Sequence, residues 1–425
     1  MDKNKDFTVK EAFKLAVENH KKNNLKQAQD LYNRVLKIDP KHAYAHNNLG
    51  LIFQNTADNQ KAKIFFEKAI EIEPNYAHAH NNLGLIFQNT GDYKKAKSCF
   101  EKAIEIDPNY AQAHCNLGVI FKELGDYPKA KDCYEKTIEV NSNHAMAHYK
   151  LGILLFEIKQ YKNAIEQFKL SDLKDSKSFL LNCLYKLGDE FSFLKELDNQ
   201  IKQGEINALI GSLTSRAEIK YKIKRSNPFC ADPLKYVFQC DLAEQYNFQN
   251  TFIKPIKNFL KEDVFSSRYQ SLVINGHQTP AILFNKKNDA LDKIKNIIYL
   301  EVEKYLDHFI ESKEGFIKFW PKSYKVNAWL VSMKSGGKIE PHMHENGWLS
   351  GSIYINVPPK LEINNGNLIV SINDQEIEAK KNINHKVMDV VTGSLCLFPA
   401  SLHHYTIPFE SNEDRIVLAF DIIST

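Results

Sequence analysis

Histidine side chains gather in two short segments of the C-terminal third of the sequence. His342 and His344 are two residues apart, and His403 and His404 are neighbours about 60 residues later. In a strand, residues i and i+2 face the same side, so the first pair can face one ion together. Three protein ligands that leave positions open are typical of non-haem iron, which must also bind a cosubstrate and dioxygen. The spacing therefore predicts a metal site built from both segments.

The elements that must position these histidines are short apolar or alternating runs separated by turn residues. The runs are YKVNAWLVSM, SGSIYINVP, GNLIVSI, GSLCLFP and RIVLAFDII. Several strands at this spacing predict a β-sandwich or barrel. Five to seven strands can be placed against the eight of a jelly roll. One long amphipathic helix is expected before them, at 289–312.

This region resembles the 2-oxoglutarate-Fe(II) oxygenase family that is often found behind tetratricopeptide repeats. The matching motifs are His342-Met343-His344, Trp348-Leu349-Ser350-Gly351, Tyr354, Phe398-Pro399 and Arg415. The match covers roughly 320–425 well and 250–320 weakly. The resemblance implies a double-stranded β-helix (jelly roll) and oxidative decarboxylation of 2-oxoglutarate, with Fe(II) as cofactor and dioxygen as a further cosubstrate.

The resemblance also implies a metal-ligand set. His342 matches the first ligand, and counting from Phe398-Pro399 places the distal ligand at His404, so His403 should face away. His344 stands where most of the wider superfamily has Asp or Glu, so a neutral imidazole replaces an anion. The adjacent Glu345 would point to the other face of a strand and could ligate only if the backbone bends.

Two further positions are implied to bind the cosubstrate. Arg415 lies eleven residues after His404, where a guanidinium can grip the distal carboxylate of 2-oxoglutarate with two hydrogen bonds. Tyr354 could add a phenol hydrogen bond to the same cosubstrate, or be a core aromatic residue of its strand.

The first 173 residues repeat with a step of 34. Clean copies occupy 43–76, 77–110 and 111–144, and diverged copies stand at about 9–42 and 145–173. Each copy holds two apolar runs of helical period. The copies closely resemble tetratricopeptide repeats, with Leu-Gly in the first helix, Ala and then Phe in the second, and a closing Pro. An α-solenoid is therefore expected ahead of the β domain.

Repeated polar residues suggest what the solenoid binds. Asn48, Asn82 and Asn116 recur just before Leu-Gly, and this resembles the asparagine ladder of the O-linked N-acetylglucosamine transferase superhelix. An amide there can pair with the backbone of an extended protein or peptide. A plain spacer or stacking scaffold is the alternative. The histidines with the same period are interpreted as polar residues of a helix face; they are His46, His80, His114 and His148.

The repeat ends before a less regular stretch. We expect a helical cap and connector at 174–249, where no chemistry is evident, and the oxygenase-like domain at 250–425. A solenoid needs such a cap to cover its last apolar face.

Composition limits the classes of function. The net charge of +4 is small and dispersed, which argues against a nucleic-acid groove. The seven cysteines include no CxxC pair, so neither a disulfide framework nor a cysteine zinc site is expected. Neither a signal peptide nor a membrane span is evident, so the cytoplasm is the expected location.

The sequence thus predicts a dioxygenase that hydroxylates a protein or peptide recruited by the repeats. Two alternatives remain open at this point. The jelly roll could lack turnover and serve as a binding module, or it could act on a small molecule while the repeats mediate protein–protein assembly.

Overall fold

The computed structural model describes residues 8–261, 272–281, 283–285, 288–375 and 384–425. The chain divides into two compact units, 1–147 and 148–425. The expected boundaries after 173 and after 249 stay a prediction. In the part of the chain that the structure describes, no helix is long and apolar enough to cross a membrane.

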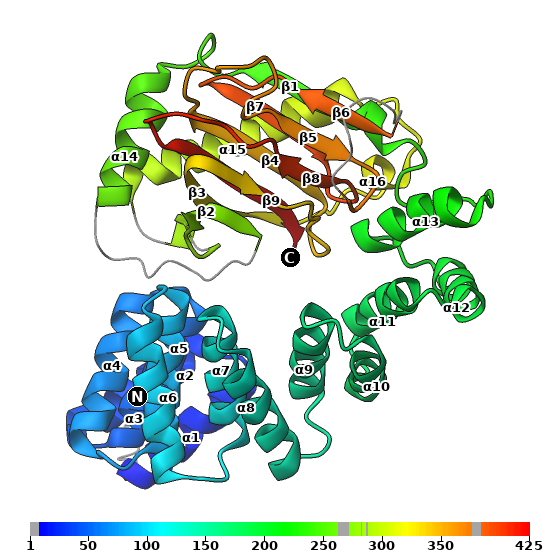
Figure 1. Cartoon of the computed structure of the whole chain (residues 1–425). Coiled ribbons are helices and arrows are strands. Elements are labelled where there is room, and N and C mark those ends of the chain that lie inside the picture. The colour runs from blue at the N-terminus through cyan, green and yellow to red at the C-terminus, as the bar shows by residue number, and fades with distance from the viewer. Residues whose placement is uncertain (1–7, 262–271, 282, 286–287, 376–383) are drawn as a thin grey trace. The chain divides into compact units, whose positions relative to one another are not determined.

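The first unit consists of paired helices. They are α1 (Val9–Lys21), α2 (Leu25–Ile38), α3 (Ala43–Asn55), α4 (Asn59–Ile72), α5 (Ala77–Asn89), α6 (Tyr93–Ile106), α7 (Ala111–Glu123) and α8 (Tyr127–Val140). Figure 1 shows them stacked side by side, coloured blue to cyan. Repeated aspartates cap the second helix of each clean copy, as Asp92 does by accepting a hydrogen bond from the backbone N–H of Lys95. The expected solenoid is confirmed.

The repeated glycines explain why the helices of a pair approach so closely. A Cβ atom at Gly84 would lie 2.6 Å from the ring of Phe100, which is fully buried on the paired helix. The same contact joins Gly50 to Phe66. Each first helix therefore needs a residue without a side chain where the aromatic ring of the second helix packs.

Five more helices follow, and the second unit begins within the first of them. They are α9 (Ala145–Glu157), α10 (Tyr161–Ser171), α11 (Lys174–Leu187), α12 (Glu190–Lys202) and α13 (Ala208–Tyr221). The helices α9 and α10 form the diverged fifth repeat, and α11 to α13 occupy the expected cap. Leu197 and Leu213 of the cap belong to the same hydrophobic core as Phe316 and Leu349 of the β domain. The cap is thus packed as part of this unit.

Nine strands follow in the described residues. They are β1 (Phe238–Asp241), β2 (Val273–Gln278), β3 (Tyr324–Ile339), β4 (Leu349–Asn356), β5 (Leu368–Ser371), β6 (His385–Met388), β7 (Ser394–Pro399), β8 (His403–Thr406) and β9 (Arg415–Ser424). They form an antiparallel sheet in the order β1-β7-β4-β9-β3-β2 and a second in the order β6-β5-β8. This two-sheet arrangement confirms the expected jelly-roll class.

The larger sheet is covered on its outer face by α15 (Asp289–His308), which lies behind the strands in Figure 1. This helix ends slightly before the predicted 312. Its Ile298 and Val302 share a core with Leu418 and Phe420 of β9. The residues of β9 that alternate with these face the smaller sheet, because successive side chains of a strand point to opposite sides.

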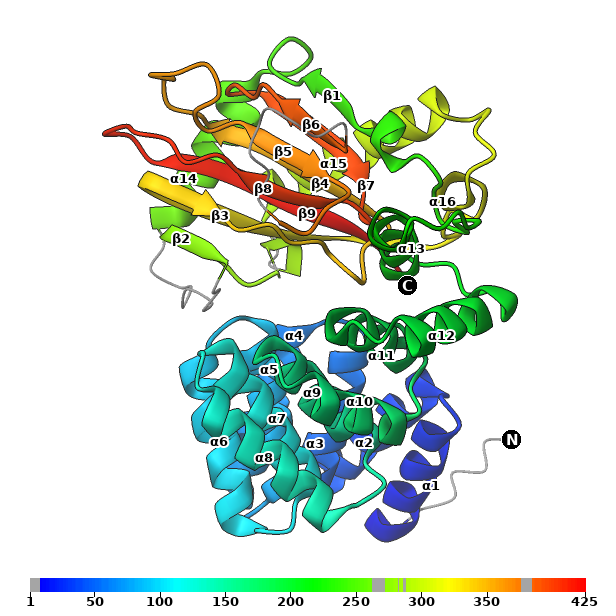
Figure 2. The same cartoon turned by 45° about the vertical axis from the view of Figure 1, so that its right-hand side comes forward.

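Short helical segments complete the unit: η1 (Pro233–Tyr236), η2 (Gln249–Ile253), α14 (Lys254–Lys261), η3 (Leu283–Asn285) and α16 (Gly315–Lys318). Figure 2 shows α14 and α15 on the same side of the strands.

Candidate metal centre

The first histidine segment is a loop and not a strand. His342 and His344 follow β3, and His342 forms an isolated antiparallel bridge with His404 of β8. The backbone N–H of His404 donates to the carbonyl of His342 at 2.8 Å, and the reverse hydrogen bond measures 3.2 Å. The expectation that both residues lie on a strand is wrong. The bridge to β8 holds the loop instead, so the two segments meet without a regular strand.

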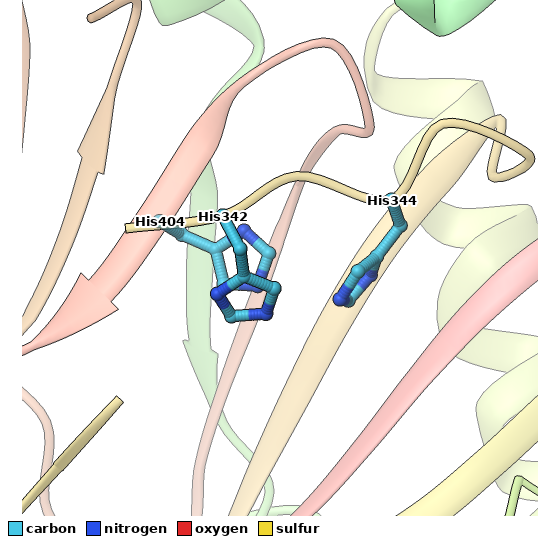
Figure 3. Close-up of side chains that lie close together, drawn as sticks. All are labelled: His342, His344 and His404. Carbon is cyan, nitrogen blue, oxygen red and sulfur yellow. The ribbon is translucent and has the colours of Figure 1, made fainter. Parts of the chain in front are cut away.

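Three imidazoles converge at this bridge. The candidate ligand atoms of His342, His344 and His404 all lie within 4.8 Å of one another. The ring centroids of His342 and His404 are 4.3 Å apart, and those of His342 and His344 are 5.0 Å apart. Figure 3 shows the rings directed toward a common space from the loop and from the strand. An ion bound at about 2 Å from each nitrogen requires the nitrogens to lie within about 4 Å of one another, so small rotations of these rings would complete a metal site.

Two of these imidazoles are held neutral. Burial, with a smaller effect from the ring of His344, lowers the pKa of His342 to about 3. Burial also holds the pKa of His404 well below its ordinary value. Neutral rings keep the lone pairs that a metal ion needs, so neither residue must lose a proton to bind one near neutral pH.

His344 differs because a carboxylate touches it. Burial alone would lower its pKa, but the charge of Asp421 and a hydrogen bond to it raise the pKa above the ordinary value. The Nδ1 of His344 lies 2.7 Å from Oδ1 of Asp421, and the hydroxyl of Ser350 donates to the same oxygen at 2.8 Å. Asp421 was not among the residues predicted from the sequence to belong to the site.

Glu345 and His403, the sequence neighbours of the candidate ligands, do not belong to the cluster of three histidines. Glu345 lies in the turn after His344 and is outside the cluster that could hold an ion. Burial raises the pKa of its carboxyl group. His403 is buried on β8 and is also outside that cluster.

Arg415 is the first residue of β9 and is fully buried. Its Nη1 donates to the carbonyl of Gly366, and its guanidinium carbon lies 5.0 Å from the centre of the Tyr354 ring. Its Nε and Nη2 have no hydrogen-bond partner among the described residues. Burial lowers the pKa of Arg415. Since an unpaired buried charge is costly, these two free donors fit a carboxylate that enters from solution.

The structure also places charged residues of the cap beside the smaller sheet. The carboxylate of Asp374, which follows β5, lies 2.8 Å from Arg216 of α13 and 2.7 Å from Lys186 of α11. Burial alone would raise the pKa of Asp374, but Arg216 and Lys186 hold it at about 2. No chemistry was evident in the connector from its sequence, because these pairs join residues more than 150 positions apart.

The repeated asparagines contact one another across the helices. Asn82 donates to the side-chain oxygen of Asn47 at 2.9 Å, and Asn116 does the same to Asn81. Asn48 donates to the hydroxyl of Tyr32 at 3.1 Å. Binding of a peptide at these amides stays a prediction, and it would require the amides to exchange partners.

The repeated histidines are hydrogen-bonded within the solenoid. The Nε2 atoms of His46, His80 and His114 lie 2.9 to 3.0 Å from the carbonyls of prolines six residues earlier. His148 contacts Gln167 at 2.8 Å. These contacts tie the start of each repeat to the end of the one before it.

Comparison with protein families follows the same division. Residues 327–421 match the family described as "Putative 2OG-Fe(II) oxygenase". Tetratricopeptide-repeat models match residues 42–109 and 75–143. Further repeat models match 18–56 and 115–175. Among curated proteins, none matches the chain.

Solved structures resemble the repeat helices at low identity. PilF of Pseudomonas aeruginosa is 20% identical, covers 46% of this chain and 91% of its own, and has a TM-score of 0.43. PilW, a type IV pilus biogenesis factor, is 20% identical over 51% of this chain and 95% of its own, with a TM-score of 0.41. YrrB, a repeat protein with an unusual peptide-binding site, is 21% identical over 40% of this chain and 91% of its own, with a TM-score of 0.35. These likenesses carry no argument about function, and it is the family matches that identify the parts: the chain combines tetratricopeptide repeats with a C-terminal domain of the 2OG-Fe(II) oxygenase family.

Proposed function

We propose that this chain is an Fe(II)- and 2-oxoglutarate-dependent dioxygenase that hydroxylates a protein or peptide recruited by its repeats. The family match of residues 327–421 supports the reaction class. The cluster of His342, His344 and His404 would supply three ligands, and a metal ion held by three ligands would keep positions open for cosubstrate and dioxygen. Repeat solenoids usually bind other proteins, which supports a macromolecular substrate.

The residues of the site would divide the work between them. The three histidines would hold Fe(II), which with 2-oxoglutarate as reductant and dioxygen as oxidant would supply the chemistry that hydroxylates a substrate C–H bond. Arg415 would bind the distal carboxylate of 2-oxoglutarate through its Nε and Nη2, and the adjacent ring of Tyr354 would fix the guanidinium plane. Buried Val417 and Trp329 on the same sheet would keep water from the space between the two sheets.

The state of Arg415 is the observation that carries the proposal. A purely structural arginine with no exposed surface would be paired with an acidic residue, because burying its charge alone is expensive. Within the described residues no Asp or Glu forms an ion pair with it, its side-chain neighbour is the phenol of Tyr354, and Nε and Nη2 have no well-aligned hydrogen-bond partner. A dicarboxylic cosubstrate supplies the missing anion.

The experiment is the binding of Fe(II) and 2-oxoglutarate to protein purified without oxygen. We expect one Fe(II) per chain and a metal-to-ligand absorption band when 2-oxoglutarate is added. His342→Ala and His404→Ala should lose both signals, and Arg415→Ala should keep the metal and lose the cosubstrate. His277→Ala is the matched control, because His277 is exposed on β2 of the same domain. Wild-type protein that binds neither partner would refute the proposal.

Histidine at position 344 favours one second candidate, a jelly roll that binds the metal without turnover. Release of succinate from 2-oxoglutarate, with iron and ascorbate present, separates the two. Succinate above the level of the His342→Ala variant supports an oxygenase. Metal and cosubstrate binding without any succinate would leave a binding module, with the repeats as a protein–protein scaffold.

A further inference from the structure

The three histidines of the cluster have different partners on their second ring nitrogen. The Nδ1 of His342 lies 2.9 Å from the carbonyl oxygen of Glu340, a neutral acceptor. The Nδ1 of His404 has no hydrogen-bond partner among the described residues. The Nδ1 of His344 faces the carboxylate of Asp421. An anionic partner therefore reaches the cluster through one of its three members.

The strands around Asp421 fix this carboxylate firmly. Asp421 is 6% exposed and lies between Ser350 of β4 and Asn327 of β3 in the larger sheet. Its Oδ1 accepts from Ser350 as well as from His344. A Cβ atom at Gly347 would lie 3.3 Å from the same oxygen, so the loop that follows the histidines packs directly on it.

The ring of His344 is held from a second side as well. The indole of Trp329 contacts it edge to face, with ring centroids 5.2 Å apart. The backbone N–H of Trp348 donates to the carbonyl of Ile422 at 2.7 Å, which fastens the end of the same loop to β9. A hydrogen bond on one edge and an aromatic ring on another restrict the orientation of this imidazole.

This arrangement has a chemical consequence. A hydrogen bond from Nδ1–H to a carboxylate fixes the tautomer, leaves the Nε2 lone pair for an ion, and makes the imidazole a stronger ligand. Three neutral imidazoles alone would leave the full charge of a divalent ion uncompensated in a buried site. A carboxylate bonded to one of them offsets part of that charge from one residue further out.

We propose that Asp421 is a positioning residue for the metal, which orients His344 and supplies through it the negative charge that the cluster of three histidines lacks. The inference rests on the proposed metal site and adds to it a residue that makes no direct contact with the ion. This role of Asp421 also explains how a neutral histidine can replace an acidic ligand at position 344, because the carboxylate keeps a negative charge beside the site.

The test is a titration of the purified full-length chain with Co(II) alone, read from the visible absorption of the bound ion. Asp421→Asn keeps an acceptor for His344 and Ser350 but removes the charge, and Asp421→Ala removes both. We expect Co(II) affinity to fall by about 10- to 100-fold in Asp421→Asn and at least as far in Asp421→Ala. The absorption bands should shift in both variants. The matched control is Asp232→Asn, which makes the same chemical change at a half-exposed position paired with Lys235.

The outcomes separate the two claims. Wild-type protein that binds Co(II), together with an Asp421→Asn variant that binds within about threefold of it, would overturn the role of Asp421 and leave the metal site standing. Wild-type protein that binds no Co(II) would overturn both.

A second measurement needs no substitution at Asp421, in case that variant does not fold. Long-range proton–nitrogen spectra of histidine-labelled, Zn(II)-loaded protein report the tautomer of His344, whose signals are assigned from their loss in His344→Gln. A proton on Nδ1 is expected, and a proton on Nε2 would overturn the inference.

Discussion

Arg415 and Asp421 lie on the same face of β9, six residues apart, and point into the space between the two sheets from opposite ends of the strand. Arg415 contacts Tyr354, whereas Asp421 contacts His344. The rise of a strand separates their Cα atoms by about 20 Å. One rigid element thus carries at one end the guanidinium that we propose binds the cosubstrate, and at the other end the carboxylate that contacts His344. A strand is better suited than a loop to keep two such groups at a fixed separation.

We predict that the buried charge of Arg415 lowers the free energy of unfolding of the chain, although the same residue binds 2-oxoglutarate. In Arg415→Met the chain keeps a long apolar side chain and loses a buried charge, so the free energy of unfolding should be unchanged or rise by about 1–2 kcal/mol. Binding of 2-oxoglutarate should be lost. Urea unfolding and isothermal titration measure the two effects on the same samples.

The conservative variant sharpens this prediction. Arg415→Lys keeps the charge but cannot form two parallel hydrogen bonds with one carboxylate, so cosubstrate affinity should fall while unfolding changes little. A loss of several kcal/mol of stability in Arg415→Met would contradict our interpretation, because it would show that the contacts of the guanidinium with Gly366 and Tyr354 stabilise the fold by more than its buried charge costs.

Much of the fold could be predicted because long elements carry their own pattern. The 34-residue step specifies helix pairs through Gly84 and Phe100, which recur at fixed positions. The five predicted runs correspond to β3, β4, β5, β7 and β9. The strands β1, β2, β6 and β8 were not among the predicted runs, because their sequences mix apolar and polar residues without a clear period. The strand β5 is as short as β1, β6 and β8, but it could be predicted because it is apolar up to Ser371.

The site was predictable where motifs are local and not where contacts cross the sheet. His342, His344 and His404 were selected from spacing and resemblance, and the structure brings them together. Asp421 was missed because its role depends on a neighbouring strand and loop. One signal was present in the sequence: residues 415 and 421 differ by an even number, so they share a face of one strand.

The close contact between Gly84 and Phe100 predicts that an added methyl group destabilises the repeats. Alanine favours a helix over glycine by about 1 kcal/mol, whereas overpacking a filled core costs about 1–3 kcal/mol. The ring of Phe100 is fully buried and has no room to move away, so the second effect should win. Gly84→Ala should therefore lower the free energy of unfolding by about 1 kcal/mol, measured by urea melts followed by circular dichroism.

Two further variants test the reason for this loss. Asn89→Ala, at an exposed position of the same helix, should be neutral or slightly stabilising. Replacing Phe100 by Leu in the Gly84→Ala background should recover part of the loss. Equal losses with and without that second change would show that the contact is not the cause.

The hydrogen bond between Asn82 and Asn47 predicts a coupled pair. Asn82 is 8% exposed and Asn47 is 3% exposed, so removing either amide leaves the other buried without this partner. Each alanine variant should cost about 1–2 kcal/mol of unfolding free energy. The double variant should cost less than the sum of the two, because the second change removes a group that is already unsatisfied.

The control for this cycle is Asn55→Ala at an exposed position of α3, which should change stability by less than about 0.5 kcal/mol. If Asn82 and Asn47 behave additively, the amides do not depend on each other. They would then be available to pair with a bound peptide in the way the repeated asparagines suggest.

The ion pairs of Asp374 predict how the cap responds to acid. The pKa of Asp374 is held at about 2, below its ordinary value of 3.8, so the pairs stabilise the folded chain above that ordinary value. This contribution is lost as the pH falls through about 2. The shift in pKa corresponds to about 2 kcal/mol, which we reduce to about 1–2 kcal/mol because Lys186 and Asp374 are partly exposed.

Asp374→Asn should be less stable than wild type by about 1–2 kcal/mol at pH 7, and the difference should shrink steadily between about pH 4 and pH 2. Urea unfolding at several pH values measures it, with Asp389→Asn at a largely exposed position as the control. A difference that stays constant down to pH 2 would show that the carboxylate of Asp374 does not hold α11 and α13 through its charge.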